Sequence, residues 1–520
     1  MKLRRVPTLL LLAALFGAAS LSAEAPEQQV TILYTNDFHS ALDPIPAYWL
    51  PDSPLLGGAA KLSTLINQVR ERERPTFLFD AGDMFTGSLS FLTRGEVLME
   101  MMLAMRYDAM AIGNHEFDYG AANFSKQMHR VPFPVLGANI FYRGTSHRYS
   151  RPWTIVERDG VRLGVIGVIG LDARSVVLPA GISELDFTDP VGAVAEGVRE
   201  LEANVDLTVV LAHQGKTGPM QTDAEARSDV RRDFDEDAHL AGAVPGIDVL
   251  IGGHAHRGIE QPWVHPSTGT LVVQTYGYGT RLGYLRLKVR EGRVTAHDGR
   301  LLEVRSDTLA PDPVVEARLA PYREHAKPVI GEVVGTLAHR LVRDYRAESS
   351  LGSFVADVMR EVSGAEVAFQ NAGGLRADLP AGAVTRGNVL DALPFVNSVV
   401  AMELTGVQIR AVLEQGLTLE RGMIQVSGLR AEYDLGRSPG RRLVSLAIGG
   451  APADDARRYR VATNSFLAQG GDLYTTFLQG AKPIDGGELL SDVVMRHLRP
   501  RGEVGLPASG RLVPHPAARP

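Results

Sequence analysis

The segment Gly113-Asn114-His115-Glu116-Phe117-Asp118 carries side chains well suited to chemistry. It follows a short apolar run, Ala109 to Ile112, which is typical of a buried β-strand ended by glycine. Asn114 offers a neutral oxygen ligand, His115 an imidazole, and Asp118 a carboxylate that can orient the imidazole. These residue types predict a metal-assisted hydrolytic site in which Asn114 binds metal and His115 acts on the substrate. Taken alone, the segment is also compatible with a polar loop of capping residues.

Four further apolar runs end in oxygen or nitrogen donors, usually beside a glycine. Apolar runs that alternate with helical segments are typical of layered α/β structure, where ligands gather at the carboxyl edge of the sheet. Because glycine lets the backbone turn sharply, side chains that follow different strands can converge on one centre. The side chains that we expect to bind metal there are Asp37, His39, Asp83, Asn114, His213, His254 and His256.

Seven ligands are too many for one catalytic ion with an open position, which usually takes three protein groups. They suit two divalent ions that share a bridging carboxylate, and Asp83, which follows the Gly82 turn, is the expected bridge. Two cations roughly 3.5–4 Å apart can hold a shared hydroxide as nucleophile and neutralise a phosphate oxygen. The donor set allows zinc, manganese, iron or cobalt and does not choose among them. The remaining ligands divide into Asp37, His39 and His256 for one ion and Asn114, His213 and His254 for the other.

Each ligand has an ordinary interpretation when it is considered singly, because a histidine at a strand end is more often a surface or capping residue. Their joint occurrence in order, each at a strand terminus, favours the metal site. Other histidines, such as His129 and His147, lack this setting and are expected to be structural. His115 is not needed as a ligand. Held and kept cationic by Asp118, it would stabilise developing charge or protonate the leaving oxygen.

The 520-residue chain is too long for one ordinary core, so two domains of unequal size are expected. Hydrophobic residues make up 45% and charged residues 22%, which is typical of a globular protein. A formal net charge of −6 argues against binding of a nucleic-acid polymer, although a small phosphorylated ligand needs only a local positive patch.

The N-terminus predicts export. Lys2, Arg4 and Arg5 precede the apolar run Leu9 to Phe16 and a small-residue cleavage site at Ala23-Glu24-Ala25, so residues 1–25 are interpreted as a signal peptide. The alternative is a membrane anchor, for which the run is short. The absence of cysteine excludes disulfides and thiolate metal sites. We expect a secreted protein, in a bacterial periplasm or the medium, without stable membrane insertion after cleavage.

The order of apolar and helical segments predicts a first domain over residues 26–305 and a second over 329–513, with a tail at 514–520. A linker at 306–328 would contain a helix from Asp312 to Lys327 that ends before Pro328. The mixed-charge run Arg227 to Asp237 is expected to be a solvated helix or loop.

The motifs around Asp37, Asp83, Asn114, His213 and His254 resemble those of the calcineurin-like metallophosphoesterases. In the second half, three segments resemble the nucleotide-binding segments of the 5′-nucleotidase and UDP-sugar hydrolase family, in order. These segments are Asn371-Ala372-Gly373-Gly374-Leu375-Arg376, Leu393-Pro394-Phe395 and Asn464-Ser465-Phe466-Leu467-Ala468-Gln469-Gly470-Gly471-Asp472. The resemblance covers about residues 30 to 513.

The resemblance implies a four-layered α/β/β/α metallophosphatase sandwich, joined by a helix to a smaller mixed α/β nucleotide-binding domain, with the active site between them. Phe395 and Phe466 would then clamp the base, a mode of stacking that tolerates different bases. Arg376 would hold phosphate oxygens, Asp472 would accept hydrogen bonds from the ribose, and Asn371 would contact the nucleoside. Without the resemblance, core phenylalanines and a Gly-Gly turn are the ordinary interpretation.

One segment departs from the family pattern. Ser350 and Ser353 stand where relatives tend to have asparagine or arginine, so a second phosphate-binding arginine is missing there. Arg346 lies nearby in the sequence and would be a substitute. The departure leaves open the choice between monophosphate and diphosphate substrates.

The sequence therefore predicts a secreted phosphohydrolase with two metal ions that removes the 5′-phosphate of nucleotides, with UDP-sugar hydrolysis as a further activity. The alternatives are a relative that acts on a 2′,3′-cyclic nucleotide or a sulfur compound, and a periplasmic protein that binds nucleotides without turnover. Because the base and the metals would lie on different domains, hinge motion near Pro328 is also expected.

Overall fold

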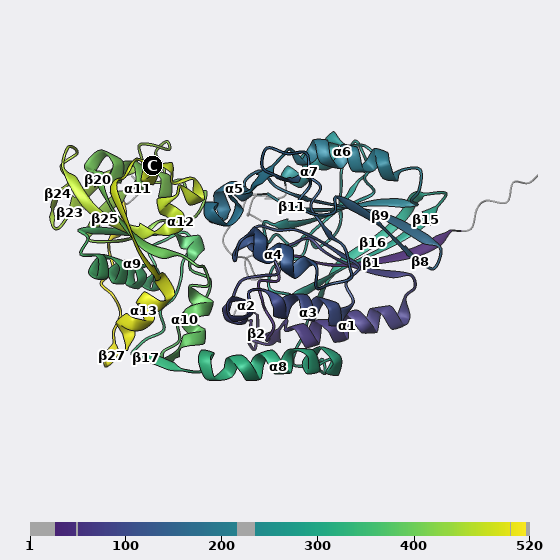
Figure 1. Cartoon of the computed structure of the whole chain (residues 1–520), viewed down its shortest axis with the longest axis horizontal. Helices are drawn as coiled ribbons and strands as arrows, with labels where there is room; N and C mark the ends of the chain where they lie inside the picture. The colour runs from purple at the N-terminus through teal and green to yellow at the C-terminus, as the bar shows by residue number, and fades with distance from the viewer. Residues whose placement is uncertain (1–26, 48–49, 216–234, 500, 516–520) are drawn as a thin grey trace, which may run out of the picture.

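The computed structural model describes residues 27–47, 50–215, 235–499 and 501–515 (Figure 1). The predicted signal peptide and most of the mixed-charge run Arg227 to Asp237 lie outside these residues. Within them, none of the helices combines the length and the apolar composition that crossing a membrane requires.

Two six-stranded sheets form the centre of the first domain. The first sheet has the strand order β16 (Arg293–Glu303), β15 (Arg281–Arg290), β1 (Gln28–Thr35), β4 (Thr76–Asp80), β5 (Ala109–Ala111) and β6 (Val135–Leu136). The second has the order β13 (Trp263–Val264), β14 (Leu271–Val273), β12 (Val249–His254), β11 (Leu207–Gln214), β9 (Val161–Ile169) and β8 (Trp153–Arg158). Short pairs flank them, β2 (Ile45–Pro46) with β3 (Leu55–Leu56) and β7 (Ile140–Tyr142) with β10 (Leu185–Phe187).

The two sheets pack face to face through a fully buried apolar core that includes Ile32, Phe77, Val165 and Val209. Helices cover both outer faces, as Figure 1 shows. The first sheet is covered by α1 (Ala59–Arg72), α2 (Ser88–Thr93), α3 (Glu96–Met105) and α4 (Ala121–Met128), and the second by α6 (Pro190–Leu201) and α7 (Asp235–Ala243). This arrangement confirms the predicted four-layered α/β/β/α fold.

Strand direction brings the polar strand ends together. β1, β4 and β5 are mutually parallel in one sheet, and β9, β11 and β12 in the other, so each set of carboxyl ends lies at one edge. His213 and His254, which were expected to follow their strands, lie within β11 and β12. These two histidines are therefore held by the sheet itself and not by a following loop.

The connecting helix α8 runs from Pro313 to Ile330 and does not end before Pro328, which corrects the predicted boundary. Pro321 and Pro328 lie inside the helix at a cost in backbone hydrogen bonding and sterics, and buried Val315, Leu319 and Ala326 anchor α8 on the first domain. The helix therefore extends the first domain to the start of the second (Figure 1).

The second domain is a smaller mixed α/β unit around a five-stranded sheet. The sheet has the order β21 (Gln425–Ser427), β18 (Val367–Gln370), β25 (Arg458–Asn464), β20 (Ser398–Thr405) and β26 (Ala481–Leu489). One face carries α9 (Ser350–Ser363), α10 (Arg386–Ala392) and α13 (Leu490–Leu498), and the other α11 (Gly406–Gly416) and α12 (Ser465–Ala468). Smaller sheets join β19 (Gly382–Thr385), β17 (Val333–Leu337) and β27 (Glu503–Val504), and β24 (Ala451–Pro452), β23 (Leu443–Ile448), β22 (Leu429–Tyr433) and β28 (Leu512–Pro514).

Candidate active site

Five of the seven predicted metal ligands have an unusual backbone conformation. Their φ angles are positive, a region that side chains other than glycine rarely adopt because of steric clash. Such conformations cost free energy and persist only where the surrounding structure fixes them, which happens most often at functional sites. The residues and their φ angles are Asp37 at 51°, His39 at 46°, Asp83 at 64°, His254 at 71° and His256 at 53°.

Two glycines allow the strand ends to approach each other. Gly82 has φ of 95°, and a Cβ atom there would lie 2.7 Å from the Gly113 nitrogen and 2.8 Å from Nδ1 of His213. A Cβ atom on Gly113 would lie 2.3 Å from Oδ1 of Asp83. Any side chain at either position would therefore push Asp83 and His213 apart.

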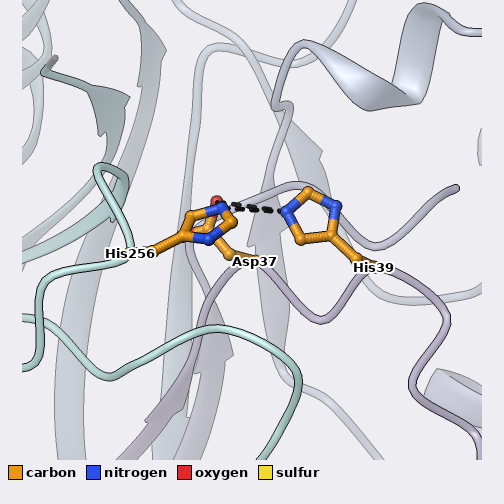
Figure 2. A group of neighbouring side chains, drawn as sticks. All are labelled: Asp37, His39 and His256. Carbon is orange, nitrogen blue, oxygen red and sulfur yellow. Dashed lines mark hydrogen bonds and ion pairs between the residues drawn. The ribbon is translucent and has the colours of Figure 1, made fainter. Parts of the chain in front are cut away.

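The first predicted ligand set converges as Figure 2 shows. Nε2 of His256 lies 3.2 Å from Oδ1 of Asp37 and 2.9 Å from Nε2 of His39. All three side chains are buried, and their donor atoms could hold one metal ion. The two nitrogens face each other, so a cation between them and the carboxylate suits the arrangement better than one shared proton.

The second predicted set meets around Asp83. Its Oδ2 atom lies 3.1 Å from Nε2 of His213 and 4.0 Å from Nε2 of His39, which links the two sets. Oδ1 of Asn114 lies 3.2 Å from Nε2 of His213. Asp83, His213 and His254 could together hold a metal ion. The structure thus brings all seven side chains to one centre, with Asp83 between the two sets.

The pKa values of the predicted ligands are shifted by burial and by neighbouring charges. Burial alone would raise the pKa of Asp83, but His213 and His115 hold it well below its usual range. Burial and then the charge of Arg376 keep the pKa of His39 well below normal, so this imidazole is neutral as a ligand must be. Burial lowers the pKa of His213, yet Asp83 raises it to about 10. The buried carboxylate of Asp83 thus requires a positively charged partner, a role that a divalent ion would fill.

His115 lies beside this cluster, with Nδ1 facing Asp118 and Nε2 facing Asp83. Its Nδ1 atom lies 3.1 Å from both carboxylate oxygens of Asp118, and its Nε2 atom lies 3.9 Å from Oδ2 of Asp83. Burial would lower the pKa of His115, but Asp118 and then Asp83 raise it above its ordinary value. The imidazole is therefore held in one orientation and favours the cationic form.

Glu116, which was not predicted to be a site residue, contributes to this wall of the site. Its fully buried carboxylate accepts hydrogen bonds from the backbone nitrogens of Gly113, Asp83 and Met84 at 2.7, 2.9 and 2.8 Å. It therefore ties the loop after β4 to the loop after β5. In the sequence, the only indication of this role is that Glu116 directly follows His115, the predicted catalytic residue.

The opposite wall comes from the second domain. A cleft that opens to solvent lies between the domains. The first domain lines it with Asp83, Asn114, His115, Asp118, His254 and His256, together with Val176 and Leu178. The second domain lines it with all five predicted substrate residues, Asn371, Arg376, Phe395, Phe466 and Asp472, and with Tyr345 and Asn397.

Hydrogen bonds between side chains organise this second wall. Nδ2 of Asn371 donates to Oδ2 of Asp472 at 2.7 Å, and Nδ2 of Asn464 donates to Oδ1 of Asn371 at 3.0 Å. Burial raises the pKa of Asp472, and Arg421 is the main charge that opposes this effect. Asp472 follows Gly470 and Gly471 with φ of 52°, so the Gly-Gly turn presents its carboxylate to the cleft.

The two predicted clamp residues have different surroundings. The Phe395 ring stacks on His115 across the domain boundary, with ring centroids 5.6 Å apart, and the Arg376 guanidinium lies 5.9 Å from the centre of the same ring. Phe466 lines the cleft but also packs in the core of the second domain. Arg346 is exposed and is not among the residues that line the cleft, so the structure does not place it as the substitute arginine.

A buried arginine, Arg421, does lie at the domain boundary. It contacts Asp172, whose carboxylate also contacts His254. Burial would raise the pKa of Asp172, but His254 and then Arg421 hold it at about 2. Neither residue belongs to a motif that the sequence offered, because both lie in loops without a distinctive pattern.

Comparison with known proteins identifies the family. Residues 30–258 match the calcineurin-like phosphoesterase family, and residues 330–479 match the C-terminal domain of 5′-nucleotidases. The crystal structure of a 5′-nucleotidase precursor from Thermus thermophilus is 30% identical, with a TM-score of 0.82, over 94% of this chain and 100% of that one. The chain belongs to the 5′-nucleotidase family. It is a metal-dependent hydrolase of that family.

Two curated relatives of this 5′-nucleotidase-family hydrolase are somewhat less similar. A 5′-nucleotidase from Diplobatis ommata is 28% identical over 96% of this chain and 92% of its own length. The trifunctional nucleotide phosphoesterase protein YfkN from Bacillus subtilis is 29% identical over 93% of this chain. The match spans only 35% of YfkN, about a third of its length.

Proposed function

We propose that this protein removes the 5′-phosphate of nucleotides with the help of two divalent metal ions. One observation carries the proposal. A single cleft is lined by metal-binding groups and His115 from the first domain and by Asn371, Arg376, Phe395, Phe466 and Asp472 from the second. A nucleotide placed there would have its phosphate at the metal ligands and its nucleoside at the second domain.

The first wall would do the chemistry. Two bound ions would neutralise phosphate charge and supply the nucleophile for hydrolysis at neutral pH. Asp37, His39 and His256 would hold one ion, Asn114, His213 and His254 the other, with Asp83 between them. His115, oriented by Asp118 and cationic, would stabilise charge on the phosphoryl oxygens or give its Nε2 proton to the leaving 5′-oxygen.

The second wall would bind the rest of the substrate. Arg376 would hold phosphate oxygens with its planar guanidinium. Asp472, fixed by Asn371, would accept hydrogen bonds from the ribose hydroxyls, and Phe395 and Phe466 would stack on the base. The partner of the protein is therefore a small nucleotide, and cleavage of UDP-sugars is part of the proposal as a secondary activity.

The N-terminal sequence supports export, so we place the protein outside the cytoplasm, in the periplasm or the medium. Signal-peptide cleavage after Ala25 would leave a chain that begins at the first described strands. N-terminal sequencing of the mature protein recovered from a bacterial host tests this step, and a retained residue 1 would contradict it.

The activity itself is tested by removing and restoring the metal. Stripping with EDTA should abolish phosphate release from AMP, and added Mn²⁺, Zn²⁺ or Co²⁺ should restore it. UDP-glucose in the same assay measures the secondary activity. Phosphate release that is indifferent to EDTA, or a folded and metal-loaded protein that releases no phosphate from any nucleotide, would contradict the proposal.

A further inference from the structure

Asp172 occupies a boundary position between the domains. It follows β9 of the first domain and directly precedes the short helix α5 (Ala173–Val176). Helix α5 packs against the turn η5 (Gly471–Leu473) of the second domain, which contains Asp472. Figure 1 shows α5 on the side of the first domain that faces the second. The chain therefore places a carboxylate where the two walls of the cleft meet.

The carboxylate of Asp172 contacts one residue from each domain. Its Oδ2 atom lies 3.0 Å from Nε2 of His254 and 3.4 Å from Nη2 of Arg421. The side chains of His254 and Arg421 are 2% and 9% exposed and that of Asp172 is 21% exposed, so both contacts are partly shielded from solvent. An ion pair in such a place interacts more strongly than one at the surface.

The contact with Asp172 determines which nitrogen of His254 can bind metal. A proton on Nε2 is donated to the carboxylate, which leaves the lone pair of Nδ1 available. Nδ1 of His254 is buried, and within the described part of the chain it has no hydrogen-bond partner. It belongs to a side chain that could hold a metal ion together with Asp83 and His213.

Arg421 also connects the boundary to the nucleotide side of the cleft. Burial raises the pKa of Asp472, the residue proposed to bind the ribose, and the positive charge of Arg421 is the main cause that lowers it. One guanidinium thus acts on a carboxylate from each wall. Separation of the walls would remove Arg421 from Asp172, because the two residues belong to different domains.

We propose that Asp172 is a positioning residue for His254, and that Arg421 holds Asp172 in place only while the walls of the cleft are together. The inference rests on the proposed metal site. It makes metal affinity depend on cleft closure. Thermodynamic linkage then requires that a ligand which closes the cleft tightens metal binding, and that bound metal tightens the binding of that ligand by the same factor.

The experiment measures Mn²⁺ binding to the metal-stripped full-length protein by calorimetry, with and without adenosine. Substitution of a carboxylate that orients a metal-binding histidine typically weakens metal binding by about 10–100-fold. Asp172→Asn should therefore weaken Mn²⁺ binding at the site that contains His254 by about that factor.

Arg421→Gln should weaken Mn²⁺ binding less than Asp172→Asn does, and it should abolish the tightening of Mn²⁺ binding by adenosine. Arg421→Lys, which keeps the positive charge, should restore part of the Mn²⁺ affinity and part of the adenosine effect. Arg346→Gln, which changes an exposed arginine of the same domain, is the matched control and should leave Mn²⁺ binding unchanged.

A double-substitution cycle decides whether the two residues act through one contact. In the Asp172→Asn background, Arg421→Gln should cause no further loss of Mn²⁺ affinity. Unchanged affinity in Asp172→Asn, or independent losses that multiply in the double variant, would overturn the proposal. If Asp172→Asn does not fold, the two Arg421 variants test the proposal. Adenosine that still tightens Mn²⁺ binding in Arg421→Gln, or that fails to do so in Arg421→Lys, would then contradict it. Because Mn²⁺ binding is measured without turnover, failure here is distinguishable from failure of the proposed activity.

Discussion

The two walls of the cleft are organised in different ways. On the first wall, strand ends with positive φ angles, such as those at Asp37, Asp83 and His254, aim ligands at one buried centre. On the second wall, Asn371, Asn464 and Asp472 are joined by hydrogen bonds between side chains. The first wall is thus fixed mainly by backbone geometry and the second mainly by a polar network.

The difference follows from what each wall has to bind. A metal centre tolerates little displacement of its ligands, so preorganisation by a strained but over-determined backbone suits it. A nucleoside is bound by stacking and by a few hydrogen bonds, and among the three residues of this network only Asp472 has a positive φ angle. The comparison predicts that damage to the first wall lowers the catalytic rate and that damage to the second lowers affinity and selectivity.

The largest effect is expected for His115→Ala. Loss of a positioned acid typically costs about 10²–10⁴-fold in rate, so kcat for AMP should fall by that factor while KM changes little. Steady-state phosphate release measures both constants, with His129→Ala, an exposed histidine of the same domain, as the control. Unchanged turnover in His115→Ala would remove this residue from the chemistry and revive a protein that binds nucleotides without hydrolysing them.

Phe395→Ala should have a smaller and more selective effect. Stacking of a base on an aromatic ring is worth about 1–3 kcal/mol, so kcat/KM for AMP should fall about 5- to 150-fold. The same variant should lose far less activity with p-nitrophenyl phosphate, which has no nucleobase. Because Phe395 also stacks on His115, the contrast between the two substrates separates its roles. Equal losses with both substrates would exclude the base clamp.

Asp118→Asn should cause the smallest change, a displacement of the pH profile. Asp118 raises the pKa of His115 above its ordinary value, so the cationic imidazole persists to higher pH in the unmodified protein. Without that charge the pKa falls, and the loss of activity on the alkaline side should begin at lower pH. A profile of kcat/KM against pH measures the shift. An alkaline limb that stays in place would show that Asp118 does not tune His115.

Much of the first wall could be predicted from the sequence, because its ligands follow apolar runs whose strand character is locally encoded. The boundary of α8 was not predicted correctly, since Ala326 and Ile330, on either side of Pro328, both pack on the first domain. Arg346 was a reasonable neighbour in sequence, yet it is exposed and lies outside the lining of the cleft. Proximity along the chain was a poor guide there, because the neighbouring residue Tyr345 lines the cleft and Arg346 does not.

The sequence by itself determined the identity and order of the donor groups, the strands that precede them and the two-domain organisation. Tertiary structure alone decided which groups meet. His39 and His256 are 217 positions apart and come together only through the order of strands in two packed sheets. Asp172 and Arg421 meet only because two domains pack against each other. Local sequence encodes strands and turns, whereas such contacts depend on the packing of the whole chain.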